Sequence, residues 1–364
     1  VDMAAAKATL AALTGEEVVA RQNAEFYGVQ NVNSTTQVAD ALMVRGVELT
    51  EKTTTGKWKV SKEVLDSLDD PLAKAVRTAK GAGKAMSSWV EPILTQGSIS
   101  QRVHARINSL RARTGRMSVS DPALQQLPRD DFRIRGCLIA DEGMTLIAAD
   151  FDQIEVRVMA YLAGDKEILK ALKAGTDIHS SVAENIYGPN FTAEERAKAK
   201  QVVFAQLYGA GYVTLARQAG ITHLEAKKLM AAFKMKYIET ISWADKQIQQ
   251  ARFMGGSLQS PFGRRLPVDM GAEFRIVNHL IQSSAADVFK AGLTAVHEVY
   301  GEYLLLPIHD EILMQVPEDR AHEIGEHVCE LMGMTLGEYP ITASYKICGR
   351  SWGDAYKPKE ALSV

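Results

Sequence analysis

The segment LLLPIHDEILMQV, residues 304–316, constrains the fold of this 364-residue chain more than any other. Two apolar runs, each as long as a buried strand, stand on either side of His309, Asp310 and Glu311. Burying an unpaired carboxylate costs several kcal/mol, and burying two side by side costs more. The pattern therefore predicts two strands joined at a polar turn whose acids serve a chemical purpose.

A second apolar run that ends in an acid occurs in TLIAADFDQIEVR, where Asp150 precedes a helical pattern. Taken singly, Asp150 could cap that helix and the HDE segment could be an ordinary polar turn. If the two strands are neighbours in one sheet, however, their carboxylates lie a few ångströms apart. Divalent cations would remove the repulsion, and oxygen ligands favour Mg²⁺ over zinc. Paired metals of this kind clamp the attacking and leaving oxygens of a phosphoryl transfer.

A third motif, RAKAKQVVFAQLYG (196–209), repeats a cation or an aromatic every four residues: Arg196, Lys200, Phe204 and Tyr208. On a helix these side chains cover an arc of about 120° and a length of about 18 Å, comparable to a nucleoside triphosphate. Thr192 and Glu195 have the form of a capping box, which would fix the helix start and its positive dipole end. Phosphates at one end and a base at the other fit this pattern. An amphipathic helix with core aromatics and surface cations remains the alternative.

The bulk composition sets wider limits. Hydrophobic residues make up 46% of the chain, enough for a large core, and three cysteines without a CxxC pair predict neither a disulfide framework nor a thiolate zinc site. A reducing cytoplasm fits best, and no apolar run is long enough for a membrane span. The net charge of −2 argues weakly against a nucleic-acid binder, but residues 101–116 contain five arginines and no acid.

The chain outside these motifs is predicted to be mostly helical. Residues 1–95 should form helices broken by polar loops, with Ser34 or Thr35 as a helix cap. Residues 166–255 should be rich in helix. The further expected elements are a strand at 144–151, a helix at 154–164, a turn or hairpin at 255–269, helices at 273–301 and 319–333, and a strand at 341–349.

Taken in chain order, the three motifs resemble those of family A DNA polymerases, the bacterial DNA polymerase I type. DFDQIEVR (150–157) is similar to the family's DYSQIELR, the helix resembles RxxxKxxxFGxxYG, and HDE is the family's third motif. The resemblance covers nearly the whole chain. It extends to TGRMSVSDPALQQLP (114–128), DIHSSVAENIYG (177–188), QSSAADVFK (282–290) and CGRSWGDAY (348–356).

The resemblance implies roles for matching residues. Asp150, the Phe151 carbonyl and Asp310 would hold two Mg²⁺ ions, for which Mn²⁺ could substitute, with Glu311 in a supporting role. Lys200 would contact the triphosphate and protonate the departing pyrophosphate, and Glu155 would close the space of a 2′-hydroxyl. The remaining nucleotide contacts would be Gln153, His179, Arg196, Phe204 and Tyr208. Primer-template DNA would be bound by Arg116, Gln125, Asn278, Gln282 and His309.

The implied fold is α+β: a right hand with an antiparallel palm sheet, helical fingers and a helical thumb. The expected parts are a thumb at 1–105, a palm at 106–165 and 270–364, and fingers at 166–269 that close on a correct dNTP. The chain would start inside a thumb helix, either because it is shortened or because the polymerase is naturally split. A separate nuclease or processivity subunit would then be a partner, in the cytoplasm of a bacterium or of a phage-infected host.

Some positions depart from the family pattern. Asp152 replaces a serine and would add negative charge near the metals, Ala205 replaces a glycine, and Arg275 stands three residues before Asn278 where the family has an arginine four before. Two alternatives stay open. A single-subunit RNA polymerase would share the palm but place a small residue at Glu155, and an inactive polymerase-like DNA-binding subunit would not need Asp150 and Asp310.

Overall fold

The structure, a computed structural model, describes residues 1–128 and 131–356, which divide into two compact units. Unit 1 comprises Val1–Arg106, Val119–Glu142 and the segment from Cys348 onward, and unit 2 comprises Ile107–Ser118 and Gly143–Ile347. This division does not test the four-part thumb, palm and fingers boundaries, which stay a prediction.

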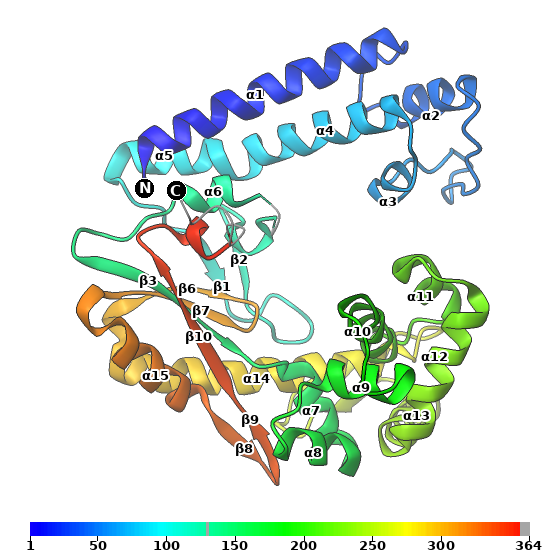
Figure 1. Ribbon diagram of the computed structural model, residues 1–364, viewed down its shortest axis with the longest axis vertical. Coiled ribbons are helices and arrows are strands. Elements are labelled where there is room, and N and C mark those ends of the chain that lie inside the picture. Colours follow the sequence, from blue (N-terminus) through cyan, green and yellow to red (C-terminus); the bar gives the residue numbers. More distant parts are fainter. Residues whose placement is uncertain (129–130, 357–364) are drawn as a thin grey trace. The chain divides into compact units, whose positions relative to one another are not determined.

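Unit 1 is built almost entirely from helices, as expected for residues 1–95. Helix α1 packs along α4 (Figure 1), and Ser34 caps α2 by accepting a hydrogen bond from the Gln37 amide at 3.3 Å. Buried aliphatic residues such as Leu42, Leu72 and Val76 form its core. The elements are α1 (Met3–Phe26), α2 (Thr35–Val44), α3 (Lys62–Asp66), α4 (Pro71–Ala85), η1 (Met86–Val90), α5 (Glu91–Ser100), η2 (Leu124–Gln126), α6 (Phe132–Gly136) and η5 (Trp352–Tyr356).

Within unit 1 the segment after Cys348 is locked against α6 by a backbone contact without room for a side chain. Trp352 is fully buried, and its amide donates to the Leu138 carbonyl at 3.0 Å. A Cβ atom on Gly353 would lie 2.8 Å from the Gly136 nitrogen and 2.8 Å from the Phe132 carbonyl oxygen. Since both neighbours are backbone, neither can rotate away. Glycine at 353 is therefore a steric requirement of this contact.

We accordingly predict that Gly353→Ala destabilises the protein by about 2–3 kcal/mol, because overpacking against backbone forces the α6 contact apart. Urea unfolding followed by circular dichroism measures the loss. Gly136→Ala is the matched control, because a Cβ there meets only Ser351 Oγ at 4.0 Å. Its stability should be unchanged or slightly higher. Equal losses in both variants would contradict the steric explanation.

A four-stranded sheet, which lies in unit 2 except for the last two residues of β10, has the order β10 (Ala343–Gly349), β3 (Met144–Phe151), β7 (Glu311–Pro317) and β6 (Leu304–Ile308). Strands β3 and β6 both pair antiparallel with β7. The predicted strand at 144–151 and the predicted hairpin around HDE are thus confirmed. Two helices, α14 (Arg275–Tyr300) and α15 (Ala321–Met332), bury their apolar faces against the alternate residues of β3 and β7 (Figure 1).

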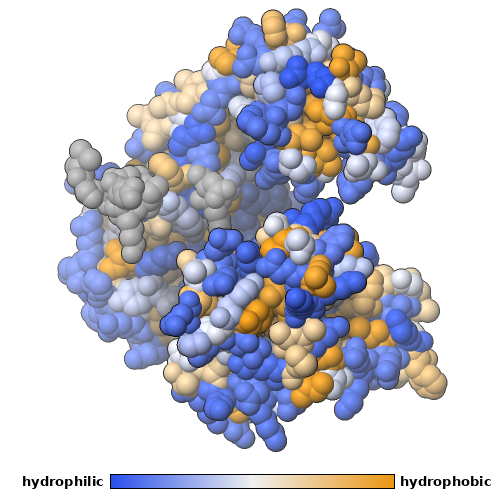
Figure 2. Space-filling model, turned by 45° about the vertical axis from the view of Figure 1, so that its right-hand side comes forward, coloured by the Kyte–Doolittle hydropathy of each residue, from blue (hydrophilic) through white to orange (hydrophobic). Residues whose placement is uncertain are grey.

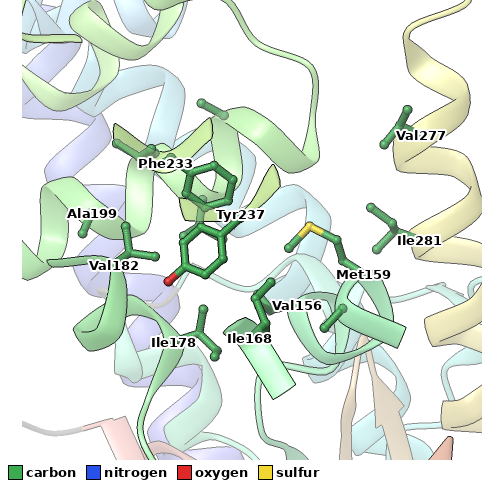
Figure 3. Packing of buried hydrophobic residues seen from close by; sticks show 14 of the residues in the cluster. Val156, Met159, Ile168, Ile178, Val182, Ala199, Phe233, Tyr237, Val277 and Ile281 are labelled. Atoms are coloured by element: carbon green, nitrogen blue, oxygen red, sulfur yellow. The ribbon is translucent and has the colours of Figure 1, made fainter. Parts of the chain in front are cut away.

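A second core in unit 2 is formed by the helices that lie between β3 and β6 in the sequence. Phe233 and Tyr237 stand at its centre with ring centroids 4.7 Å apart, surrounded by aliphatic residues from several helices and from the first turns of α14 (Figure 3). The elements are α7 (Ile154–Ala163), α8 (Lys166–Lys173), α9 (Ile178–Tyr187), α10 (Ala193–Leu207), α11 (Tyr212–Ala219), α12 (His223–Lys236), α13 (Ile238–Met254), and the hairpin β4 (Ser257–Gln259) and β5 (Arg265–Pro267). The expected helix-rich region and hairpin are confirmed.

The remaining elements are short: β1 (Arg106–Asn108), β2 (Ser118–Ser120), β8 (Met334–Leu336), β9 (Tyr339–Ile341), η3 (Gly301–Tyr303) and η4 (Glu318–Arg320). None of the three cysteines, Cys137, Cys329 and Cys348, takes part in a disulfide bond. On the face drawn in Figure 2, hydrophilic residues predominate and hydrophobic ones form small separate groups. Among the described helices, none is both long and apolar enough to span a bilayer.

Candidate active site

The two predicted acidic positions lie at the same end of neighbouring strands. Asp150, the penultimate residue of β3, stands opposite Glu311, the first residue of β7. One step further, the Phe151 amide donates a hydrogen bond to the Asp310 carbonyl at 3.2 Å. His309 and Asp310 form the turn between β6 and β7, with His309 in the left-handed region at φ 57°. Asp150 therefore meets Asp310 and Glu311, which are distant from it in sequence, at one edge of the sheet, where β3 ends and β7 begins.

The donors at this edge fit a hard divalent cation. Asp150 and Asp310 would contribute carboxylate oxygens, and buried Phe151, the residue after Asp150, would contribute its backbone carbonyl. Phe151 is itself fixed by edge-on packing against Phe289 of α14, with ring centroids 6.3 Å apart. No cluster of three or more His, Cys, Asp or Glu side chains suited to a metal occurs among the described residues. A metal here would thus need backbone, water or substrate oxygens besides the two aspartates.

Four of the predicted ligand-binding residues form one hydrogen-bonded group around Glu155. Arg116 donates to Glu155 Oε1, and the Tyr208 hydroxyl donates to Glu155 Oε2 at 3.3 Å. The Tyr208 hydroxyl is also hydrogen-bonded to the side chain of Gln282. Glu155 of α7 therefore joins Arg116, in the segment between β1 and β2, to Tyr208 at the end of α10, and Tyr208 contacts α14 through Gln282.

Burial and neighbouring charges act on this carboxylate in opposite directions. Burial raises the pKa of Glu155, the Arg116 guanidinium lowers it, and the Asp310 carboxylate raises it again. Burial also raises the pKa of Tyr208. The Asp310 contribution means that the Glu155 group lies within electrostatic reach of the acidic sheet edge.

The cation and aromatic series lies along α10 as predicted. Thr192 and Glu195 form the expected capping box, with the Glu195 amide 3.2 Å from Thr192 Oγ1. Lys200 Nζ lies 5.7 Å from the Phe204 ring centroid, and the Phe204 and Tyr208 rings stack at 6.1 Å. Tyr208 is the residue that ends the helix, not part of its last turn as the four-residue spacing suggests.

Three predicted contact residues carry buried polar atoms that lack partners within the described parts of the chain. They are His179 Nδ1, Gln153 Oε1 and Asn278 Oδ1. Unsatisfied buried polar atoms are costly and rare in native proteins. These three atoms are available to hydrogen-bond with a ligand or with water.

His179 should be neutral at physiological pH. It is 5% exposed and packs beside the Phe204 ring at 5.9 Å. Burial lowers its pKa to about 4, Asp177 opposes this shift, and Lys200 and Arg196 add to it. In its neutral form one ring nitrogen can donate to a phosphate oxygen while the other accepts.

This depressed pKa predicts a pH-dependent loss of stability. Between pH 6.5 and pH 4 the unfolded chain binds a proton at His179 that the folded chain does not, so stability falls as pH falls through this window. The loss amounts to at most about 3 kcal/mol. Urea unfolding at pH 7 and pH 4.5 should show a smaller decrease for His179→Gln than for the wild type. Parallel pH profiles for the two proteins would contradict the burial of an uncharged imidazole.

Arg196 has a partner that the sequence motifs did not identify. Its guanidinium pairs with Asp177, with Nη2 2.7 Å from Asp177 Oδ2. Asp177 is the N-cap of α9 and accepts from the Ser180 amide at 2.9 Å. The pattern DIHSS could have identified Asp177 as a helix cap, but it carries no sign of the pairing with Arg196.

Other predicted or singled-out residues are placed as follows. Gln125 lies in η2 of unit 1, where its side chain accepts a hydrogen bond from the Val119 amide at 3.3 Å. The Asp152 carboxylate accepts hydrogen bonds from Thr342 at 2.7 Å and Ser344 at 2.8 Å. Arg275 begins α14, and its guanidinium lies 3.7 Å from Asp269.

The basic segment 101–116 is partly neutralised within each unit. In unit 1 Arg102 pairs with Asp141 at 2.6 Å, and in unit 2 Arg113 pairs with Asp269 at 2.5 Å. With Arg116 bound to Glu155, three of its arginines have carboxylate partners. Its positive charge is therefore less available to DNA than the sequence suggests.

Comparison with known proteins agrees with this geometry. A family model described as DNA polymerase family A matches residues 6–354. A DNA polymerase of Mycobacterium phage D29 is 35% identical over 339 residues, covering 91% of this chain and 56% of the phage protein. The thermostable DNA polymerase I of Thermus aquaticus is 31% identical over 369 residues, covering 92% of this chain and 44% of the relative. The chain thus spans about half the length of these curated relatives.

A solved structure extends the likeness to three dimensions. It is described as the POL domain of Pol1 from M. smegmatis in complex with DNA primer-template and dNTP. The two structures superpose with a TM-score of 0.88 at 28% identity, covering 98% of this chain and 68% of the other. The predicted α+β polymerase fold is thereby confirmed.

Proposed function

The chain belongs to DNA polymerase family A, and from this premise we propose that it catalyses template-directed DNA synthesis. It adds a deoxynucleoside monophosphate from a dNTP to a primer 3′-hydroxyl and releases pyrophosphate. The observation that carries the proposal is the meeting of Asp150 and Asp310 at the joined ends of β3 and β7. The M. smegmatis relative in complex with primer-template and dNTP supports these two ligands as partners.

Residues of α9 and α10, together with Tyr208 at the end of α10, contact different parts of the nucleotide. Arg196 and Lys200, near the N-terminal half of α10, bind and orient the triphosphate, and neutral His179 donates a hydrogen bond to it. Phe204 packs on the sugar, and Tyr208 lies beside the nascent base pair. Lys200 also donates a proton to the departing pyrophosphate, which lowers the charge that develops on the leaving group.

The acidic edge would hold the divalent cations. Asp150, the Phe151 carbonyl and Asp310 would bind two Mg²⁺ ions, with Glu311 supporting the pair. Bound there, such ions supply charge stabilisation for the attacking and leaving oxygens. Gln153 contacts the nucleotide next to this edge, His309 contacts the primer end, and Arg116, Gln125, Asn278 and Gln282 bind primer-template DNA.

Glu155 favours a DNA polymerase over an RNA polymerase. Its carboxylate is held by Arg116 on one oxygen and by Tyr208 on the other, so it cannot swing aside to admit a 2′-hydroxyl without breaking both contacts. An inactive DNA-binding subunit would have no use for two acids at a sheet edge, where their repulsion costs stability. Both alternatives are therefore less well supported.

A primer-extension assay with Mg²⁺ tests the proposal. The wild-type chain should extend a 5′-labelled primer with dNTPs and should use rNTPs at least about a hundredfold less efficiently, since a pocket that clashes with one hydroxyl discriminates on this scale. Efficient rNTP incorporation would replace the DNA polymerase assignment by an RNA polymerase one. Template binding without any extension would favour the inactive subunit.

A further inference from the structure

Asp177 holds a guanidinium that the proposed function assigns to the triphosphate. One of its oxygens, Oδ2, lies 3.0 Å from Arg196 Nε and 2.7 Å from Arg196 Nη2. Ser180 Oγ lies 3.0 Å from the same Nε atom and donates to Asp177 Oδ2 at 2.7 Å. Asp177 and Ser180 thus both accept hydrogen bonds from the Nε edge of the guanidinium.

These contacts use Nε and Nη2 of Arg196 and leave the Nη1 edge outside the ion pair. A guanidinium carries five N–H donors in a rigid plane, and the Nη1 edge takes no part in the contacts with Asp177 and Ser180. The Arg196 side chain as a whole is 42% exposed and is therefore accessible to a ligand. Fixing one edge of a planar group fixes the direction of the opposite edge.

Asp177 itself is held from two further directions. Its Oδ1 accepts a hydrogen bond from Gln153 Nε2, and its Oδ2 caps α9 through the Ser180 amide. Gln153 sits in the left-handed region at φ 51°, in the turn between β3 and α7. A non-glycine residue persists there only where its surroundings determine it. Asp177 is therefore a rigid anchor tied to the acidic strand end on one side and to α10 on the other.

We propose that Asp177 is a positioning residue that acts through Arg196: it holds the Nε edge so that the Nη1 edge faces the triphosphate of the incoming nucleotide. The inference rests on the proposed function of Arg196 as a triphosphate ligand. Arginine loses much side-chain freedom when it binds phosphate, and a partner that orders it beforehand removes part of that cost.

Two other roles of Asp177 give different results in a test. If Asp177 only caps α9, any residue that caps the helix can replace it. If its charge competes with the phosphates for Arg196, removing it strengthens nucleotide binding. Positioning predicts weaker binding when the ion pair is lost, and only while Arg196 is present.

The experiment measures the Kd of dATP for the complex of the whole chain with Mg²⁺ and a dideoxy-terminated primer-template, which binds nucleotide but cannot react. Asp177→Ser keeps a good helix cap but is too short for the ion pair. It should raise the Kd about tenfold, as should Arg196→Ala. The double variant should also lie about tenfold above the wild type, because the two residues act as one unit.

Two controls complete the measurement. Asp177→Asn keeps an oxygen acceptor and should recover most of the affinity, within about threefold of the wild type, since a neutral acceptor retains part of the hydrogen bond. Thr222→Ala removes the N-cap of α12, where Thr222 Oγ1 accepts from the Glu225 amide at 3.1 Å. It should lower the melting temperature and leave the dATP Kd unchanged.

The proposal is overturned if Asp177→Ser binds dATP as tightly as the wild type or more tightly. It is equally overturned if the double variant loses about a hundredfold, because independent effects multiply. Primer extension by the wild type is measured in parallel. If the wild type binds nucleotide without extending the primer, the polymerase assignment is wrong. The dATP Kd values of the two single variants and the double variant still decide the role of Asp177.

Discussion

Replacing Asp310 by alanine is expected to lower primer extension by at least about a thousandfold, because it removes one of the two carboxylates proposed to hold the cations that would stabilise developing phosphoryl charge. Affinity for primer-template DNA should stay within about twofold, since an acid beside the strand ends does not attract phosphates. Single-turnover extension kinetics and a fluorescence-anisotropy titration with labelled DNA measure the two quantities separately. The residual rate gives the contribution of the carboxylate as a ratio of rate constants.

The neighbouring Asp152 offers a matched control for this experiment. It lies two residues after Asp150, but its carboxylate oxygens accept hydrogen bonds from Thr342, just before β10, and from Ser344, near the start of β10. Asp152→Asn should therefore change extension by no more than a few fold. If Asp310→Ala keeps near-normal extension, or if Asp152→Asn loses as much, the assignment of the metal site to Asp150 and Asp310 is wrong.

The second large effect is expected for Lys200. Lys200→Ala should lower the maximal rate of nucleotide addition by about a hundredfold to ten-thousandfold, the range typical of a lost general acid with additional charge stabilisation. The dATP Kd should rise less, because Arg196 and His179 still bind the phosphates. Rapid-quench measurements over a range of dATP concentrations separate the rate from the affinity.

Lys198 is the control on the same helix. It is ion-paired with Glu194 one turn away at 3.1 Å and lies off the Arg196–Lys200–Phe204 line. Lys198→Ala should stay within about twofold of the wild type in both parameters. Lys200→Arg keeps the positive charge but is a much weaker acid, so it should restore affinity without restoring the rate. Full recovery of the rate by arginine would argue against proton donation.

Local sequence patterns predicted the elements that carry these residues. The strand MTLIAADF is found at Met144–Phe151, the HDE hairpin has its turn at His309 and Asp310, and the Thr192 capping box starts α10. Each depends on residues close in sequence, where hydrophobic period, caps and turns act directly. The pairing of β3 with β7 followed from one added assumption, that both acids serve one site.

Contacts between distant segments could not be read in the same way. Nothing in the sequence near Arg116 or Glu155 shows that they pair, because their meeting depends on how the sheet edge, α7 and α10 are packed. The Asp177 pair with Arg196 was missed for the same reason. Three-residue strands such as β8 escaped prediction because a pattern of that length carries too little periodicity.

Helix α14 belongs to both cores of unit 2. Its first turns, with Ile276 and Leu280, pack among the helices around Tyr237, and its later turns, with Val288 and Val296, pack on the sheet. The helices α8 to α13 and the strands that carry the acids therefore pack against the same continuous helix. If α8 to α13 move relative to the sheet, α14 must either bend or shift against one of the two cores in which it is packed. Its packing therefore limits how far these helices can move.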